Sequence, residues 1–352
     1  MRNQMCCRHA ITVFFGLFAV LPSNLDAQSP KDSELHSIFW KQIAQEVDNQ
    51  KFDLLESQYS ELKNEKAVIE DGTPKIWLYF ESYYENNRNL TANIQEAQEF
   101  TKRLRAWHTL WPDSIAAILA LCNALVGESD RIWDVARKEN RDPKDAESRG
   151  EVKSRLLEFN STLEELPRQV GDQLRAEAAF YAVKIKMLAA ISAPFDAVQE
   201  IQREIEQVDT YYVPFYLTYS SWLLGNRQND RSLPRPEVWL TNRFKTDILD
   251  TEEIKRRKCR AYAQIIAFHG NGTSEFKADL LDWSTLESGL RDLVHSYGSQ
   301  TDWPSRYLVT AFAFHDKDAT REALAIVNGN YSTDVIKFPI AFQAISNWAE
   351  TQ

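Results

Sequence analysis

The stretch WPSRYLVTAFAFHDKDATREALAIV (residues 303–327) decides the fold, because it contains two helical patterns and one turn. Apolar residues recur at helical spacing over 303–314 and again over 318–328, and the polar triplet at 315–317 separates the two runs. Alanines are frequent in both halves, and such small side chains let neighbouring helices approach closely. The stretch therefore predicts an antiparallel helical hairpin.

This hairpin opens on a Trp-Pro element that has an earlier copy, WPDS at 111–114 beside WPSR at 303–306. Proline lacks a backbone N–H, so it is tolerated in the first turn of a helix, where that donor has no partner. Asp113 and Ser114 in the first copy, and Asp302 in the second, provide oxygen acceptors at the positive end of the helix dipole. We therefore interpret both copies as helix starts and not as a site.

Helical spacing of apolar residues recurs through most of the chain. Two polar stretches, 139–151 and 225–236, interrupt it and predict exposed loops. No segment alternates apolar and polar residues over five or more positions, so we expect no sheet. Further helices are predicted at 35–47, 93–110, 113–126, 174–188, 195–208, 251–269, 283–297 and 333–349.

These patterns predict an all-α fold of stacked antiparallel helical hairpins, an irregular α-solenoid of tetratricopeptide-like type with no significant β-sheet. The first 27 residues are the exception. They place charged residues, an eleven-residue apolar run and a small residue in the order of a secretory signal peptide, although an uncleaved membrane anchor is the alternative. We expect a signal peptide at 1–27 and a helical-repeat domain at 28–352, with 139–151 as the candidate point of subdivision.

Charge and cysteine content limit the partners and the compartment. The chain has 41 basic and 51 acidic residues, and loss of the signal would leave a net charge of about −11. Such a surface repels phosphate backbones, so we expect no nucleic acid partner. We also expect no stable membrane insertion after signal cleavage, and an exported protein that is periplasmic or extracellular. Cys122 and Cys259 follow the signal, and the sequence leaves open whether they pair.

Several stretches after the signal share a pattern of aromatic and small residues. They lie at 51–84, 111–125, 211–224, 236–244 and 303–327. In their order and spacing they resemble a bacterial family that is known only as a domain of unknown function. The resemblance covers most of the chain after the signal and implies a tetratricopeptide-type helical array. It implies no catalytic residue, and a Trp-Gly-Gly-like element of the family is replaced here by GNRQND at 225–230.

Aromatic residues provide the candidate binding surface. They crowd two predicted helices, and adjacent rings such as Tyr83 and Tyr84 do not fit on a single apolar stripe. One interpretation is a concave surface that grips a peptide or a sugar, because tyrosine and tryptophan offer large amphipathic contacts. The other is that the rings fill gaps between helical layers. The candidate residues are Trp77, Tyr79, Tyr83, Tyr84, Tyr211, Tyr212, Tyr216, Tyr219 and Trp222.

Motifs for chemistry are missing from the sequence. No two of the five histidines after the signal have the four-residue spacing that places imidazoles on one helix face for a metal ion. No Gly-x-Ser-x-Gly element presents a nucleophilic serine. We therefore assign no catalytic residue, no metal ligand and no cofactor.

The favoured hypothesis is a non-enzymatic interaction scaffold that binds a protein or peptide partner. The alternative is a secreted all-α carbohydrate-active enzyme that uses paired carboxylates in an aromatic-lined cleft. A third option is a structural role through self-association. The sequence does not identify the ligand, the partner or the oligomeric state.

Overall fold

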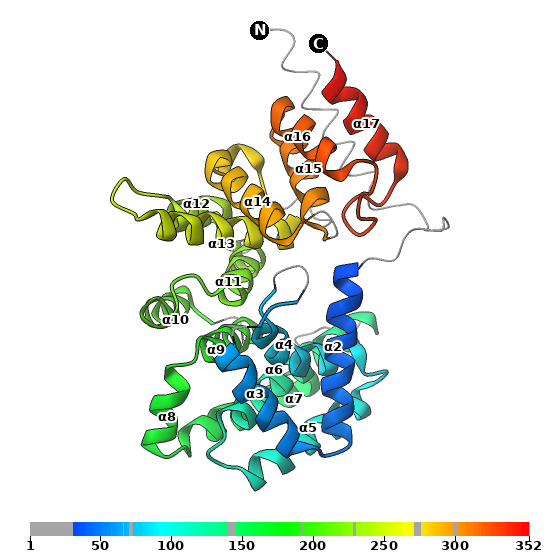
Figure 1. Cartoon of the computed structure of the whole chain (residues 1–352). Helices are drawn as coiled ribbons and strands as arrows, with labels where there is room; N and C mark the ends of the chain where they lie inside the picture. The colour runs from blue at the N-terminus through cyan, green and yellow to red at the C-terminus, as the bar shows by residue number, and fades with distance from the viewer. Residues whose placement is uncertain are drawn as a thin grey trace. The chain divides into compact units, whose positions relative to one another are not determined.

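The structure is a computed structural model that describes residues 31–65, 67–69, 73–139, 146–191, 193–227, 230–270, 276–298 and 301–351 (Figure 1). The predicted signal at 1–27 lies outside the described residues, and so do residues 140–145 of one predicted loop. The signal peptide and the export that follows from it therefore stay predictions.

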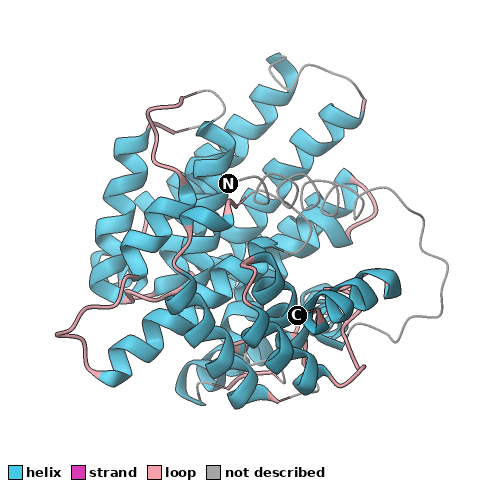
Figure 2. Ribbon diagram, turned by 90° about the horizontal axis from the view of Figure 1, so that it is seen from above, coloured by secondary structure: helices cyan, strands magenta, loops and turns pink. Residues whose placement is uncertain are grey.

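The described residues form sixteen α-helices, one π-helix and one 3-10 helix, and no β-sheet (Figure 2). A single isolated bridge, between Val68 and Pro74, is the one strand-like pairing among them. The predicted all-α class is confirmed, whereas the solenoid arrangement stays a prediction. The helices are α2 (Lys31–Asp48), α3 (Phe52–Glu65), α4 (Lys75–Glu85), η1 (Asn86–Leu90, the π-helix), α5 (Ile94–Leu110), α6 (Ile115–Lys138), α7 (Ala146–Glu164), α8 (Arg168–Arg175), α9 (Ala178–Ala190), α10 (Phe195–Val208), α11 (Val213–Arg227), α12 (Pro236–Phe244), α13 (Glu252–Gly270), η2 (Ala278–Leu280), α14 (Trp283–Tyr297), α15 (Trp303–Ala313), α16 (Lys317–Val327) and α17 (Pro339–Glu350).

The chain divides into two compact units. The N-terminal unit comprises residues 35–69 and 73–219, and the C-terminal unit consists chiefly of Ser220–Gln352. The division falls within α11. The polar stretch 139–151 lies inside the N-terminal unit, between α6 and α7, which pack against each other.

One helix, α6, forms the centre of the N-terminal unit. Every residue from Ala116 to Ser129 is buried, because α4, η1, α5, α7 and α9 all pack against this helix. Its apolar residues surround the whole helix and not one stripe, as a fully enclosed helix requires. At Gly127 a Cβ atom would lie 2.5 Å from the carbonyl oxygen of Tyr84, so glycine is required for α4 to pass this closely.

The C-terminal unit is built from helices that pack on their neighbours in sequence. α13 packs on α14, α14 on α15, α15 on α16 and α16 on α17. The closest approach is at Gly289 in α14, where a Cβ atom would lie 2.0 Å from the carbonyl oxygen of Cys259 in α13. The hairpin predicted from 303–327 is confirmed as α15 and α16.

Both Trp-Pro elements precede or open a helix, as interpreted from the sequence. Ser114 caps α6, since its hydroxyl oxygen accepts a hydrogen bond from the Ala117 N–H at 3.1 Å. Pro112, however, lies in the turn before the helix. In the second element Pro304 lies in the first turn of α15, and the N-cap residue Asp302 forms an ion pair with Arg306 at 3.6 Å.

Several predicted boundaries were wrong. The helix predicted at 174–188 is interrupted, since α8 ends at Arg175 and α9 begins at Ala178. The apolar spacing continues across this short turn because both helices bury residues beside it. The last helix begins at Pro339 and not at 333, because proline favours a helix start. α7 begins at Ala146, inside the loop predicted at 139–151, and α11 extends to Arg227, inside the loop predicted at 225–236.

The two cysteines that follow the predicted signal are free and buried. Burial raises the pKa of the Cys122 thiol in α6 and of the Cys259 thiol in α13. Because the thiolate is the reactive form, both side chains are poor nucleophiles. Their place in the structure is that of small apolar residues in the core.

Candidate functional site

The π-helix η1 interrupts the regular helical structure of the N-terminal unit directly after α4. Its backbone bond from the Thr91 N–H to the Asn86 carbonyl oxygen, at 3.0 Å, spans five residues, where an α-helix spans four. Such π-helical turns are rare, and many lie at functional sites. Asn86 and Asn87 are both buried, although asparagine is mostly an exposed residue. A polar site is therefore built into this part of the core.

The two buried asparagines attach η1 to three other helices. The Asn86 amide donates to the carbonyl oxygen of Trp40 in α2, at 3.1 Å. The Asn87 amide donates to the Thr101 hydroxyl in α5, at 2.7 Å, and to the carbonyl oxygen of Ala124 in α6, at 2.9 Å. Each amide thus bonds to a backbone or hydroxyl group at a fixed position, which holds η1 rigidly.

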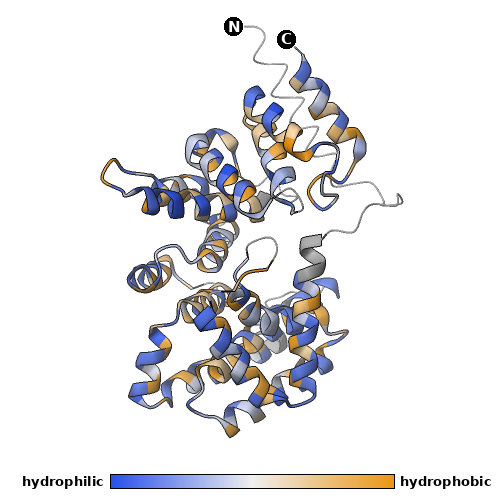
Figure 3. Cartoon of the chain, in the orientation of Figure 1, coloured by the Kyte–Doolittle hydropathy of each residue, from blue (hydrophilic) through white to orange (hydrophobic). Residues whose placement is uncertain are grey.

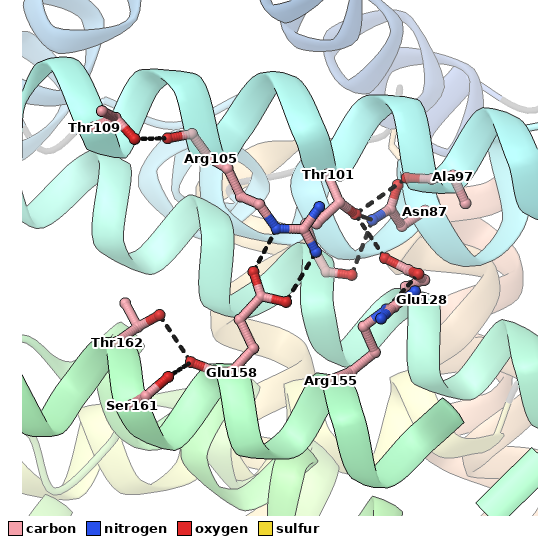
Figure 4. A network of polar contacts seen from close by, with 11 residues as sticks. Asn87, Ala97, Thr101, Arg105, Thr109, Glu128, Arg155, Glu158, Ser161 and Thr162 are labelled. Carbon is pink, nitrogen blue, oxygen red and sulfur yellow. Dashed lines mark hydrogen bonds and ion pairs between the residues drawn. The ribbon is translucent and has the colours of Figure 1, made fainter. Parts of the chain in front are cut away.

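A charged network continues from Thr101 into α6 and α7 (Figure 4). The Glu128 side chain is fully buried in α6; one carboxylate oxygen lies 2.9 Å from the Thr101 hydroxyl and the other accepts a bond from Arg155 of α7 at 2.5 Å. Arg105 of α5 and Glu158 of α7 form a two-pronged ion pair beside it, with one N–O distance of 2.9 Å. A buried carboxylate is tolerated only with such partners. The network therefore fixes α5, α6, α7 and η1 relative to one another.

A cavity of about 680 Å³ is lined by residues of α2, η1 and the first half of α5, including the buried Asn86. We call it the η1 groove. Ten of its thirteen lining residues carry amide, hydroxyl or charged side chains. The lining residues are Lys41, Ala44, Gln45, Asp48, Asn86, Leu90, Thr91, Asn93, Gln95, Glu96, Glu99, Phe100 and Arg103.

The carboxylates in the η1 groove already have partners. Asp48 forms an ion pair with Arg103 at 3.1 Å, and Glu99 pairs with Lys102 at 3.3 Å. Glu96 accepts a hydrogen bond from the Ala92 N–H at 2.8 Å, as part of the N-terminal cap of α5. Lys41 in α2 is exposed and forms no ion pair within the described part of the chain.

A second polar cluster joins α4, η1, α6 and α9, and we call it the Tyr84 cluster. The Tyr84 hydroxyl donates to Asp130 at 2.6 Å and accepts from Arg88 at 2.8 Å. Lys186 lies 4.0 Å from the centre of the Tyr84 ring and pairs with Glu81 at 2.6 Å. Burial raises the pKa of the Asp130 carboxyl above its ordinary value. Burial, together with the negative charge of Glu81, does the same to the pKa of the Glu85 carboxyl.

The structure buries most of the predicted aromatic surface. Trp77 and Tyr211 are partly exposed, and Trp77 meets Tyr212 edge-on at 5.6 Å. The other candidates fill space between helices, which is the second interpretation of the aromatic pattern. The buried residues are Tyr79, Tyr83, Tyr84, Tyr212, Tyr216, Tyr219 and Trp222.

The polar ends of two of these rings bind the backbone. The hydroxyl of Tyr79 donates to the Leu55 carbonyl oxygen, and that of Tyr216 to the Thr210 carbonyl oxygen, each at 2.9 Å. Tyr84 is the one candidate that belongs to a charged cluster described above. None of the nine candidates lines the η1 groove.

Sequence reasoning missed the residues of the η1 groove, although two signals point to them. One is the pair Asn86-Asn87 directly after the aromatic helix, where an apolar pattern gives way to two adjacent amides. The other is Asn93 followed by Glu96, a capping pair; the Asn93 side chain accepts from the Glu96 N–H at 2.9 Å. The signals locate a helix junction, but they do not reveal that α2 forms the other wall.

The described residues contain no group of three or more His, Cys, Asp or Glu side chains arranged to hold a metal ion. Within the same residues, every helix is too short or too polar to cross a membrane. No family model, no curated protein and no solved structure matches this chain.

Proposed function

We propose that this protein is an exported helical-repeat scaffold that holds a segment of a protein or peptide partner in the η1 groove, without catalysing a reaction. The proposal includes the solenoid arrangement, of tetratricopeptide-like type, and the likeness to the bacterial family of unknown function. It assigns binding to the N-terminal unit.

The cavity of about 680 Å³ is the observation that carries the proposal. Its size falls in the range of about 300–1,000 Å³ that is common for ligand sites. Gln45 and Gln95 offer amide donors and acceptors for the backbone of a peptide, and Lys41 offers a cation for an acidic side chain or a carboxyl terminus. A peptide supplies all of these groups in one chain.

Rigidity of the groove wall supports binding as its role. Asn87, Thr101 and Glu128 connect η1, α5 and α6 through buried hydrogen bonds. A wall that is ordered before the partner arrives does not lose conformational entropy on binding. The affinity is then limited mainly by ordering of the partner.

The groove carboxylates are already engaged by other groups, and this favours binding of a partner over hydrolysis of a substrate. A carboxylic acid that protonates a glycosidic oxygen needs a raised pKa and a free position beside the substrate. Asp48 and Glu96 are each held by a cation or a backbone N–H. They act as structural acceptors in this arrangement.

A carbohydrate-active enzyme is the second candidate, because the Tyr84 cluster contains two carboxyls, Glu85 and Asp130, whose pKa is raised. Raised carboxyl pKa values are typical of general acids. Neither residue lines the η1 groove. Turnover of a polysaccharide by the chain from Gln28 onward, and its loss in Asp130→Asn, would replace the scaffold proposal by this one.

The test is a selection of short random peptides, displayed on phage, against the chain from Gln28 onward. Selected peptides are synthesised, labelled and titrated by fluorescence anisotropy. In Lys41→Glu a groove cation becomes an anion, and we expect a loss of affinity of about tenfold for acidic peptides. The matched control is Lys153→Glu, which makes the same charge change at an exposed position of α7 outside the groove.

Affinity that is unchanged by Lys41→Glu but reduced by Lys153→Glu would place peptide binding elsewhere. Failure to select any peptide that binds in solution would contradict the proposal as a whole. Circular dichroism of both variants checks that the helical content is intact, which is expected because both side chains are exposed.

A further inference from the structure

Two adjacent aliphatic side chains project from the turn between α12 and α13. The exposed fraction of Ile248 is 92% and that of Leu249 is 89%, the highest values for large hydrophobic side chains in the described residues. The next value, 78%, belongs to Ile340 in α17. Figure 3 shows the hydrophobic colour at the outer end of this connection. Adjacent exposed apolar groups are less common on a protein surface than single ones, and contiguous apolar patches mark contact sites.

Hydrogen bonds hold this turn in an outward conformation. The Asp247 side chain accepts from the Leu249 N–H at 3.0 Å, and the Asp250 side chain accepts from the Asp247 N–H at 2.7 Å. Lys258 of α13 donates to the Asp250 carboxylate at 2.5 Å and to the Lys245 carbonyl oxygen at 3.2 Å. The Lys258 ammonium also lowers the pKa of the Asp250 carboxyl, so the clamp persists when the solution becomes mildly acidic. These hydrogen bonds therefore keep the side chains of Ile248 and Leu249 exposed.

Charges around the tip mostly neutralise each other. Asp250 pairs with Lys258, and Glu252 pairs with Lys255 at 2.9 Å. Arg256, one position further along α13, pairs with Asp292 of α14 at 2.7 Å. The tip therefore presents an apolar contact with little net charge, and its attraction to another surface is mainly hydrophobic.

The small size of the tip decides the kind of surface that it fits. A specific protein–protein interface buries about 1,200–2,000 Å² in total, far more than two side chains on a narrow turn supply. The interfacial region of a lipid bilayer accepts a small apolar wedge without a complementary surface. The paired charges behind the wedge can remain in water among the headgroups.

We propose that Ile248 and Leu249 insert into the headgroup–acyl boundary of a lipid bilayer and give the C-terminal unit a peripheral, reversible membrane contact. This contact is separate from peptide binding in the η1 groove, and either can hold without the other. It needs no membrane-spanning segment. Because the contact is hydrophobic, its strength depends weakly on salt.

The experiment is cosedimentation of the chain from Gln28 onward with vesicles of phosphatidylethanolamine and phosphatidylglycerol. The double variant I248D/L249D is expected to reduce the bound fraction at a fixed lipid concentration by about tenfold, because two apolar groups are replaced by charges. Ile340→Asp is the matched control at an exposed aliphatic position of α17, and should bind like the wild type. Raising the salt concentration should leave wild-type binding nearly unchanged.

A labelled variant locates the contact. Cys122 and Cys259 are buried and free, so an environment-sensitive dye reacts selectively at Leu249→Cys, with Ile340→Cys as the control position. Vesicles should shift the emission of the dye at 249 to the blue, and lipids with a quencher in the acyl region should quench it. The dye at 340 should not respond.

The proposal would be overturned by no sedimentation with vesicles, by wild-type sedimentation of I248D/L249D, or by a dye at 249 that stays in water while the protein sediments. Loss of binding in high salt would also overturn it, since the contact would then be electrostatic. Circular dichroism of I248D/L249D confirms that the fold is intact, as expected for two side chains that are almost fully exposed.

Discussion

The two units of this protein hold their helices together in different ways. In the N-terminal unit α6 is enclosed on all sides, and buried polar groups such as Asn86, which binds the Trp40 carbonyl oxygen of α2, connect helices that are not neighbours in sequence. In the C-terminal unit successive helices pack on one another, and many ion pairs lie at the surface, such as Arg256 with Asp292. Apolar spacing along the chain is sufficient to locate the helices of the second arrangement. The first also needs buried polar contacts, and these make a polar groove possible.

The largest expected loss of stability comes from a substitution that breaks the buried network of the N-terminal unit. Glu128→Ala leaves Arg155 and Thr101 without their carboxylate partner, and should lower the free energy of unfolding by about 3–5 kcal/mol. Glu158→Ala is the control at the more exposed pair with Arg105, and should cost about 1 kcal/mol. Urea denaturation followed by circular dichroism measures both. Equal losses would mean that burial of Glu128 adds nothing to the unit.

The next effect concerns the C-terminal unit, where the backbones of α13 and α14 pack closely. Gly289→Ala places a methyl group against the Cys259 carbonyl oxygen and should cost about 2–3 kcal/mol, because two helix backbones must separate. Gly225→Ala is the control, since no atom lies within 4 Å of its added Cβ. It should leave stability unchanged or raise it by up to about 1 kcal/mol through helix propensity. Thermal unfolding of the two variants compares them, and similar midpoints would contradict the close packing.

One carboxyl in each unit should make stability depend on pH, with opposite signs and in effects smaller than the previous two. Burial raises the pKa of Asp130 in the N-terminal unit, so this carboxyl stabilises the fold below its ordinary pKa of 3.8 and loses that contribution as pH rises through the raised value. The bond from the Ala319 N–H, and then that from the Trp283 ring, lower the pKa of Asp316 in the C-terminal unit. Its contribution is present above 3.8 and is lost as pH falls through the lowered value.

Unfolding midpoints in urea, measured across the pH range, separate these two carboxyls. Asp130→Asn should flatten the decline of stability above pH 3.8, and Asp316→Asn should flatten the decline below it. The second variant keeps an oxygen for the cap of α16, so its stability at neutral pH should change little. If either variant changed the unfolding midpoints equally above and below pH 3.8, these carboxyls would not be the cause of the pH dependence.

The smallest expected effect concerns a surface ion-pair cluster. Asp292 pairs with Arg256 at 2.7 Å and with Arg260 at 2.5 Å on the outside of α13 and α14. Asp292→Ala should cost about 0.5–1 kcal/mol, and salt should reduce that difference, because exposed pairs are screened. A loss as large as that of Glu128→Ala would remove the distinction between the units.

Much of the fold followed from the sequence, whereas the candidate site did not. The spacing at 251–269, 283–297 and 303–327 predicted α13 to α16 within one or two residues, because each of these helices packs on its sequence neighbours. The same reasoning failed between Arg175 and Ala178, where a short turn keeps the apolar spacing. Aromatic content pointed to rings such as Tyr83, which are core, because composition does not distinguish an enclosed helix from an exposed face.

The groove residues escaped prediction for a different physical reason. Lys41 and Arg103 lie more than sixty positions apart in the chain, and both line the groove only because of how α2 crosses η1 and α5. That crossing is set by contacts such as the bond from Asn86 to the Trp40 carbonyl oxygen. A pattern along one helix carries no information on such a contact.

The π-helical turn at Asn86–Leu90 changes the direction in which the chain leaves α4. One residue more than a regular turn needs rotates everything after it by about 100° around the helix axis. Removing one residue there would change the direction in which the chain leaves the helix at Thr91, and so would move the segment that leads to the cap of α5 at Asn93. The length of this short insert, together with the bonds of Asn86 and Asn87, thus sets the orientation of the wall that the partner is proposed to meet.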